Sequence, residues 1–384
     1  MAKKKVLILI DQMETGGAGR VTSTLLSGLI EKDYEVVMAL DNKNAKNFYS
    51  IPDIVKQVYI PIKEVMPVGI KQIKLIIATR KIIKQERPDV IVAVTFFPFF
   101  YAHYAALGTR TPIIAYDHTS FGRNMGRFIN WIRYNLYGKA DKLIILTEKD
   151  RKLLGEKFPC KEVVYNPLTY PITKHSINRD KTVLCAGRID SWDVKGFDRI
   201  IEIWSHLAPK YSDWKLQIAG SGSQKKIDEL KEMAFNLKVD EQIEFLGQIG
   251  DMASLYATTS IFALPSRVEG FPMVLLEAMS QGCICCAFEM GGAVKEMMSP
   301  SSGPIVKDNE VLLFEQELDK LMDQYPNYSK YRESGYKDAS RFTCETFYCQ
   351  WDKIIKSLFT SSEDKDGSYF SKNSRVLFWR EACC

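Results

Sequence analysis

The stretch VLILIDQMETGGAGRVTSTLLSGLIEKDYEVVMAL, residues 6–40, contains two apolar runs separated by a glycine turn and a helical pattern. Val6–Ile10 has the length and composition of a buried strand, and Glu35–Leu40 is a second one. Arg20–Lys32, between them, carries apolar residues at helical spacing. This order predicts a β-α-β unit, in which two parallel strands are covered by a helix.

The same alternation of strand and helix continues along most of the chain and restarts once. In the first half we expect a helix at 71–87, strands at 89–95, 113–116 and 142–147, and a helix at 148–158. After a polar linker at 175–181 we expect strands at 183–186, 214–219, 243–246, 261–263 and 284–287, with helices at 198–207, 223–237 and 273–280. The sequence therefore predicts an α/β protein with two doubly wound domains, residues 1–170 and 171–343. An amphipathic helix at 344–359 follows, and residues 360–384 form a tail with no assigned place.

The bulk composition is that of an ordinary folded enzyme. A length of 384 residues favours two domains over one. The net charge is only +5 and the basic and acidic residues are interleaved, which argues against nucleic acid as the main partner. The nine cysteines are an odd number, and those at 283, 285 and 286 lie in an apolar run, which favours a reducing cytoplasmic setting. Only five apolar residues follow Lys3–Lys5 before Asp11, too few for a secretory signal.

One segment, Val90–Thr109, has no charged residue and approaches the length of a bilayer span. It divides, however, into a strand at Val90–Thr95, a break at Pro98 and a short helix at Phe99–Leu107. We therefore expect a buried strand that leads into a helix, and no membrane span.

The glycine turn Gly16-Gly17-Ala18-Gly19 joins the first strand to the first helix. Bare glycine backbone at a helix N-terminus can approach a phosphate or a sugar closely. A purely structural turn is one alternative, and NAD binding is another. The dinucleotide fingerprint is incomplete, because Thr22 takes the place of its third glycine.

The sequence EGFPMVLLE, Glu269–Glu277, passes from a strand end through a Gly/Pro loop into a helix at Met273–Ser280. Such a helix start is an anion site, at which the amides near Phe271–Met273 would face a diphosphate. Glu269 and Glu277 flank this site and could accept hydrogen bonds from sugar hydroxyls. The alternative is a helix start with incidental glutamates.

Two cations and one histidine also follow predicted strands. Arg188 and Lys195 lie beyond the first strand of the second domain, where open α/β sheets bind ligands, and could neutralise a diphosphate. Solvated surface cations are the alternative. His118 follows the strand at 113–116 and is placed at a ligand edge of the first domain, although a satisfied core histidine is also possible. Because no His/Cys/Asp cluster and no paired-aspartate motif occurs in a suitable loop, we expect no metal site.

In their order along residues 4–359, these motifs resemble the family-4 retaining glycosyltransferases of GT-B fold. The resemblance implies two Rossmann-like domains facing a central cleft, with a nucleotide-sugar donor on the second domain and the acceptor entering from the first. Glu277 would hold the ribose, Glu269 the donor sugar, and Arg188 and Lys195 the diphosphate. The family's other positions fall on Gly16, Gly17, His118, Gly220, Ile249, Gly270, Phe271, Pro272 and Met273.

Within this set the resemblance implies particular contacts. The backbone of Gly270 and Phe271–Met273 would contact the donor sugar, His118 the transferred sugar, and Ile249 the base. Gly16 and Gly17 would approach the donor from the opposite domain, and the helix at 344–359 would cross back onto the first domain. The loop between Arg188 and Lys195 is slightly longer than the family pattern, which leaves the register of Lys195 less defined. Glu269 and His118 are the residues expected at the reacting sugar, and no catalytic base is assigned.

The predicted function is transfer of a hexose or N-acetylhexosamine from a UDP- or GDP-sugar to a glycan or lipid-linked glycan, in surface polysaccharide or lipopolysaccharide biosynthesis. No cofactor or metal is expected, and the enzyme would be cytoplasmic or at the inner face of the cell membrane. A basic and aromatic stretch at 121–142 could lie on an anionic membrane, or could be a helix packed on its own sheet. The alternatives are a nucleotide-sugar epimerase or hydrolase, and a non-catalytic sugar-nucleotide-binding protein.

Overall fold

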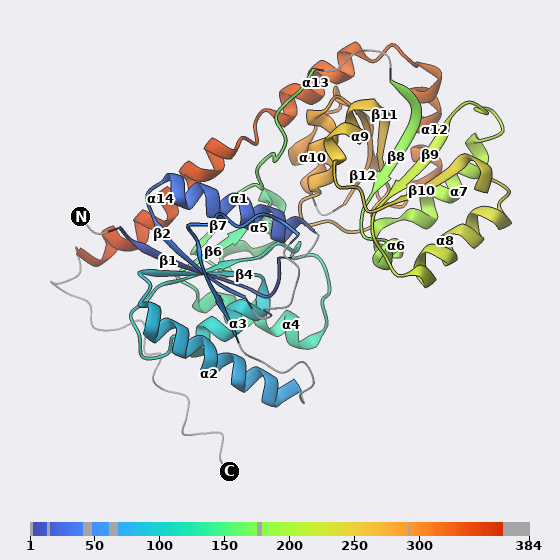
Figure 1. Ribbon diagram of the computed structural model, residues 1–384. Helices are drawn as coiled ribbons and strands as arrows, with labels where there is room; N and C mark the ends of the chain where they lie inside the picture. The colour runs from blue at the N-terminus through green and yellow to red at the C-terminus, as the bar shows by residue number, and fades with distance from the viewer. Residues whose placement is uncertain are drawn as a thin grey trace. The chain divides into compact units, whose positions relative to one another are not determined.

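The computed structural model describes residues 3–13, 16–40, 48–60, 68–174, 179–290 and 292–363. The chain divides into two compact units, both visible in Figure 1. Unit 1 comprises residues 1–146, 151–167 and 344–384, and unit 2 comprises residues 147–150 and 168–343. Most of the predicted tail, from residue 364 on, lies outside the described residues.

Unit 1 is built on a seven-stranded parallel sheet with the order β3-β2-β1-β4-β5-β6-β7. The chain winds outward in both directions from the pair β1 and β4, which makes the sheet doubly wound. The strands are β1 (Lys5–Ile10), β2 (Glu35–Leu40), β3 (Lys56–Tyr59), β4 (Val90–Val94), β5 (Ile113–Tyr116), β6 (Lys142–Ile145) and β7 (Lys161–Val163). All of β4 and β5 is buried, as expected for central strands covered on both faces.

The helices of unit 1 include one from the far end of the chain. They are α1 (Gly17–Glu31), α2 (Val68–Glu86), α3 (Phe96–Ala105), α4 (Arg127–Trp131), α14 (Cys344–Glu363) and α5 (Glu148–Leu154), whose residues up to 150 are assigned to unit 2. The ring of Tyr348 on α14 fills the space beside Gly28 of α1, where an added Cβ would lie 2.1 Å from the ring. Trp351 is only 1% exposed and meets the Tyr116 ring edge to face at 5.0 Å. The last helix therefore completes the core of unit 1.

A buried ion pair fixes the loop that follows β5. Arg133 donates to Asp117 at 2.7 Å, and both side chains are at most 1% exposed. Arg133 also donates to the carbonyl oxygen of Thr119 at 2.6 Å, and Phe121 and Tyr137 are buried beside it. Arg133 lies in a single π-helical turn, Ile132–Leu136, which directly follows α4. Phe121, Arg133 and Tyr137 are therefore internal, and these three side chains of the stretch at 121–142 are not available to a membrane surface.

Unit 2 repeats the architecture with a six-stranded parallel sheet in the order β10-β9-β8-β11-β12-β13. The winding direction reverses between β8 and β11. The strands are β8 (Asp180–Ala186), β9 (Lys215–Ala219), β10 (Ile243–Gly247), β11 (Thr259–Leu264), β12 (Ile284–Glu289) and β13 (Ile305–Lys307). The helices are α6 (Trp192–Lys195), α7 (Phe197–Leu207), α8 (Gln224–Asn236), α9 (Met252–Thr258), α10 (Met273–Ser280), α11 (Ala293–Met297), α12 (Val311–Asp323) and α13 (Ser329–Ala339).

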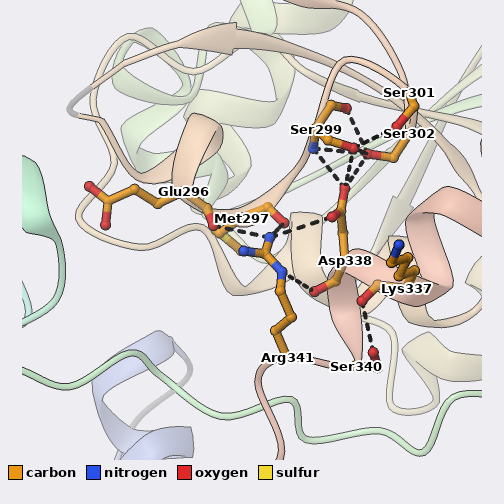
Figure 2. A network of polar contacts seen from close by, with 9 residues as sticks. All are labelled: Glu296, Met297, Ser299, Ser301, Ser302, Lys337, Asp338, Ser340 and Arg341. Atoms are coloured by element: carbon orange, nitrogen blue, oxygen red, sulfur yellow. Dashed lines mark hydrogen bonds and ion pairs between the residues drawn. The ribbon is translucent and has the colours of Figure 1, made fainter.

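A polar network joins the end of α11 to α13, as Figure 2 shows. The carboxylate of Asp338 accepts hydrogen bonds from the backbone nitrogen and the hydroxyl of Ser299, at 2.7 and 2.8 Å, and from the hydroxyl of Ser302 at 2.7 Å. Arg341 donates to the carbonyl oxygens of Met297 and Glu296, at 2.7 and 3.2 Å. The network therefore fixes the last helices of unit 2 before the chain leaves it.

The segment that resembled a bilayer span forms β4 and α3, as predicted. The predicted break at Pro98 is wrong, because α3 begins at Phe96 and contains this proline in its first turn. A proline is tolerated there, since the amides of a first turn have no partner within the helix. Within the described ranges, no helix has the length and hydropathy that a bilayer crossing requires.

Candidate functional site

The reversal of winding in unit 2 marks the place where a ligand would bind. β8 and β11 are adjacent and parallel, and their crossover connections leave on opposite sides. In open sheets of this kind, ligands bind outside the carboxyl ends of the two strands at which the order reverses. Gly187 and Arg188 follow β8, and the loop that ends at Glu269 follows β11. The motif at Gly187-Arg188 and the loop that ends at Glu269 therefore lie at the same edge of the sheet, where a ligand is expected.

Lys195 and Glu269 form an ion pair at this position. The ammonium nitrogen of Lys195 lies 2.8 Å from Glu269 Oε1, and the hydroxyl of Ser266 donates to the same oxygen at 2.8 Å. The side chains are 25% and 11% exposed, so the pair is partly shielded from solvent. The stem of Lys195 passes over Gly187, where an added Cβ would lie 3.2 Å from it. The loop between Arg188 and Lys195, which is longer than the family pattern, forms a 3-10 turn followed by α6. This structure places Lys195 at the site.

A second ion pair, which sequence reasoning missed, fastens these two loops together. Arg267 donates to both carboxylate oxygens of Asp198, at 2.7 and 2.6 Å. The backbone nitrogen of Arg267 also donates to the carbonyl oxygen of Val194 at 2.8 Å. A two-pronged arginine pair of this kind restricts orientation as well as distance. No local pattern could have found it, because the partners lie 69 positions apart.

Glycines allow the neighbouring loops to approach the site closely. Gly220 has a φ of 153°, and an added Cβ would lie 1.8 Å from the carbonyl oxygen of Gly187. Its backbone nitrogen donates to the carbonyl oxygen of Gly247 at 2.8 Å, close to Ile249. The loops after β8, β9 and β10 therefore pack backbone against backbone, which only glycine permits.

The exposed Arg188 is placed by the loop that carries it. The amide of Ile189 donates to the carbonyl oxygen of Ser221 at 2.9 Å. Asp190 accepts hydrogen bonds from the amide and hydroxyl of Ser223, at 2.8 and 2.7 Å. The amide of Ser223 and its hydroxyl lower the pKa of Asp190, which therefore stays charged at the start of α8. These contacts hold the backbone on either side of Arg188.

Glu277 is buried in the second turn of α10 and is 2% exposed. Its two carboxylate oxygens accept hydrogen bonds from the hydroxyls of Thr169, at 3.3 Å, and Tyr256, at 3.5 Å. Phe271 is also buried, and its ring meets that of Phe342 at 5.7 Å. Its side chain therefore anchors the loop, and what Gly270 to Met273 can offer to a ligand is backbone at the start of α10.

The remaining predicted residues lie at the carboxyl edge of the sheet in unit 1. Gly17 begins α1, and the backbone nitrogen of Gly16 donates to the hydroxyl oxygen of Tyr49 at 3.1 Å. His118 follows β5 and packs on Tyr116, with ring centroids 4.1 Å apart. Both ring nitrogens of His118 are buried and have no hydrogen-bond partner among the residues that the structure describes. Burial lowers the pKa of His118 to about 3, so its imidazole is neutral at physiological pH.

Two protein families match this chain in succession. Residues 15–169 match "Glycosyltransferase Family 4" and residues 172–338 match "Glycosyl transferases group 1". The chain is 25% identical to the amylovoran biosynthesis glycosyltransferase AmsD of Erwinia amylovora, across 91% of this chain and 99% of that protein.

A second relative is an alpha-1,4-N-acetyl-D-galactosaminyltransferase of Campylobacter jejuni, named for a glycan-PP-undecaprenol acceptor. It is 24% identical, across 91% of this chain and 98% of that protein. The structure of Anabaena HepE in complex with UDP and glucose superimposes with a TM-score of 0.74 at 18% identity, covering 92% of this chain and all of that one. Together with the two doubly wound domains, these matches show that the chain belongs to the GT-B glycosyltransferases of the family 4 and group 1 type.

Proposed function

We propose that this glycosyltransferase is a retaining enzyme that moves a hexose or N-acetylhexosamine from a UDP- or GDP-sugar to a glycan or a lipid-linked glycan. The observation that carries the proposal is the pair Lys195 and Glu269, beside Arg188, at the point where the sheet of unit 2 reverses its winding. Two cations, Arg188 and Lys195, lie beside the carboxylate of Glu269. This arrangement fits a ligand that has a diphosphate at one end and hydroxyls at the other.

The diphosphate of the donor would be neutralised by protein groups alone. Arg188 would bind the phosphate oxygens as a fork, and Lys195 would add a point charge. The start of α10 contributes backbone amides and the positive end of its dipole. We propose that these groups do what a divalent metal does in other transferases, so that transfer continues in the presence of EDTA.

The two glutamates would hold the neutral parts of the donor. Glu269 already accepts hydrogen bonds from Lys195 and Ser266 on one oxygen, and a carboxylate has further lone pairs for sugar hydroxyls. Glu277 already accepts two hydroxyl hydrogen bonds, which suits it to the ribose. Gly220 would let the backbone approach the diphosphate, and Ile249 would lie beside the base.

In the proposed reaction the bond between the anomeric carbon and the diphosphate oxygen breaks as the acceptor oxygen attacks from the same face. The acceptor proton passes to the departing diphosphate, so no protein nucleophile or base is required. Arg188 and Lys195 stabilise the negative charge that develops on the leaving group. His118, with Gly16 and Gly17, would contact the donor sugar from unit 1, where a neutral imidazole can exchange hydrogen bonds with hydroxyls.

The two relatives suggest the acceptor. One acts in the biosynthesis of the polysaccharide amylovoran, and the other is named for a glycan carried on undecaprenol diphosphate. We propose a surface polysaccharide or lipopolysaccharide intermediate, elongated in the cytoplasm at the inner face of the cell membrane. The structure with UDP and glucose favours a UDP-sugar as the first donor to test.

A thermal-shift panel of UDP-, GDP- and ADP-sugars tests the donor site, because a ligand that binds only the folded state raises the melting temperature. We expect one nucleotide series to shift the wild type, and Glu277→Gln to reduce that shift. Glu241→Gln, an exposed glutamate of unit 2, is the matched control and should behave as the wild type. No shift with any of the three nucleotide sugars would reject the site.

Product analysis then tests the reaction. We expect the sugar to appear on an added glycan acceptor with the anomeric configuration of the donor. Free sugar or an isomerised nucleotide sugar as the only product would contradict transfer and indicate a hydrolase or epimerase.

A further inference from the structure

The outward face of α2 is unusually apolar for a helix on the surface of a soluble domain. Ile70, Ile73 and Ile77 are 50%, 59% and 63% exposed, and their spacing puts them on one side of the helix. The opposite side of α2 is buried and supplies Leu75 and Ile82 to the core. A surface helix ordinarily directs polar residues outward, so packing within unit 1 does not account for these isoleucines.

The same outward face is positively charged. Lys74, Lys81 and Lys84 are exposed and recur at helical spacing beside the isoleucines. Glu86 is the only acidic residue in α2, and it pairs with Lys56 at 2.8 Å. Arg80 is directed inward, where it donates to the carbonyl oxygens at 105 and 107. The face therefore combines three isoleucines with three lysines and no acid.

Aromatic side chains also lie on the neighbouring helices α3 and α4 of unit 1, which Figure 1 shows beside α2. The hydroxyl of Tyr101 on α3 donates to Gln72 of α2 at 3.3 Å, and its ring stacks on Phe97 at 6.4 Å. Phe97 in turn lies 6.4 Å from Phe128 of α4, and the Phe128 ring stacks on Trp131 at 6.1 Å. Phe128 and Trp131 are 46% and 43% exposed.

We propose that the outward face of α2 docks on an anionic lipid bilayer. The isoleucines would enter the boundary between head groups and acyl chains, and the lysines would lie beside the lipid phosphates. A second copy of the chain is a poorer occupant, because two copies face to face would bring like charges together. Docking would bring the enzyme to the membrane that carries the lipid-linked acceptor of the proposed function. Binding to lipid itself requires neither donor nor acceptor.

Flotation with vesicles tests the proposal. The full chain is mixed with vesicles of phosphatidylcholine alone, or of phosphatidylcholine with phosphatidylglycerol, at low and high salt. We expect binding to the anionic vesicles only, and a marked loss at high salt because screening weakens surface charges. Binding to neither kind of vesicle would overturn the proposal.

Two variants of the face separate its charge from its apolar residues. Lys74→Glu/Lys81→Glu/Lys84→Glu should weaken binding roughly a hundredfold or more, since each lysine near an anionic surface contributes about a factor of five. Ile73→Gln/Ile77→Gln should weaken it by about tenfold, because apolar area no longer enters the bilayer. All five positions are exposed, so both variants should fold.

Control variants carry three Lys→Glu changes, or one exposed aliphatic residue changed to Gln, on unit 2. Lys225→Glu/Lys330→Glu/Lys337→Glu changes the net charge equally on α8 and α13, and Leu312→Gln removes a side chain that is 65% exposed. Both should bind vesicles as the wild type does. Equal loss in the face variants and these controls would show a general charge effect and overturn the proposal. So would a dimer in solution that Ile73→Gln/Ile77→Gln dissociates, since a second copy would then occupy the face.

The nucleotide-sugar thermal shift is measured on the same proteins. The face variants should retain it, because none of the residues that we assign to the donor lies on α2. Vesicle binding without a thermal shift would count against the donor site alone, and a thermal shift without vesicle binding against the lipid face alone.

Discussion

Lys195 and Glu269 lie partly shielded from solvent, so each depends on the other for its charge balance. Replacing the lysine removes the ammonium that we assign to the donor diphosphate. Lys195→Met should therefore raise the Kd for the bound nucleotide by roughly tenfold to a hundredfold, or about 1.4–2.8 kcal/mol. Isothermal titration with UDP measures this directly.

The matched control for that variant is Lys225→Met, an exposed lysine on α8 of the same unit. It should bind nucleotide like the wild type. If Lys195→Met binds as tightly as this control while remaining folded, Lys195 serves only to pair with Glu269 and the diphosphate contact is misassigned.

His118 should make the stability of unit 1 depend on pH. Its folded pKa, about 3, lies below the ordinary value near 6.5, so the unfolded imidazole takes up a proton first as the pH falls. The stabilisation is fully present above pH 6.5 and is lost as the pH falls from there toward 3. At pH 5 the loss should be on the order of 2 kcal/mol.

Urea unfolding at pH 7.5 and pH 5 measures this loss, with His118→Asn as the variant that should lack it. The exposed His206→Asn is the control, and it should retain the pH dependence of the wild type. If the imidazole NMR signal of His118 titrates near pH 6.5 in the folded protein, the pKa of His118 is not lowered by burial and this prediction is wrong.

Several site residues were predictable because a motif places them at a strand end. Arg188 follows β8 after a single glycine, and Glu269 and Glu277 flank the start of α10. The Arg267–Asp198 pair could not be predicted, since its partners are brought together only by the sheet order. Nor does the sequence state that His118 is neutral, because that follows from burial in the folded unit.

At the scale of elements, the buried central strands and the edge strand β10 were predictable, whereas three other edge strands were not. β4 is a continuous apolar run and β11 ends in one at residues 261–264, because helices cover both faces of each sheet. β3, β7 and β13 have three or four residues each and are only partly buried, so nothing in their pattern separates them from loops. Pro98 was misread as a break because a proline in the first turn of a helix looks the same in sequence as one that ends a segment.

The glycine loop after β9 gives the prediction that belongs to this scale. Gly220→Ala would place a Cβ against the carbonyl oxygen of Gly187, so the loops after β8 and β9 must separate. We expect a stability loss of about 1–3 kcal/mol in unit 2 and weaker nucleotide binding, since Arg188 moves with its loop. Chemical denaturation and titration with UDP measure the two effects.

Gly250→Ala is the control for that substitution, because an added Cβ there meets nothing within 4 Å. It should change neither stability nor nucleotide binding by more than about 0.5 kcal/mol. If the two variants behave alike, the close approach of the loops after β8 and β9 does not require a glycine at position 220.

At the scale of the whole chain, the repeated alternation of strand and helix made two doubly wound sheets predictable. The positions at which the chain passes from one unit to the other were harder to predict from the sequence. Residues 147–150 belong to unit 2, although the residues on both sides of them belong to unit 1. Glu296 explains this assignment, since its carboxylate accepts hydrogen bonds from the amides of Glu148 and Lys149 at 2.8 and 3.0 Å. Such a contact between distant segments has no local signature.

The return of α14 to unit 1 predicts that the two units can be weakened separately. Trp351 is buried against Tyr116, so Trp351→Ala should cost unit 1 about 3–5 kcal/mol, whereas Trp131→Ala, at a side chain that is 43% exposed, should cost far less. Hydrogen exchange read by mass spectrometry should show faster exchange in α1 and β1 of the Trp351 variant and unchanged exchange in β8 and β11. Its titration with UDP should match that of the wild type, because Arg188 and Lys195, which we assign to the diphosphate, are in unit 2. Faster exchange throughout both units would mean that the chain unfolds as a single cooperative body, and the independence of the donor site from α14 would be lost.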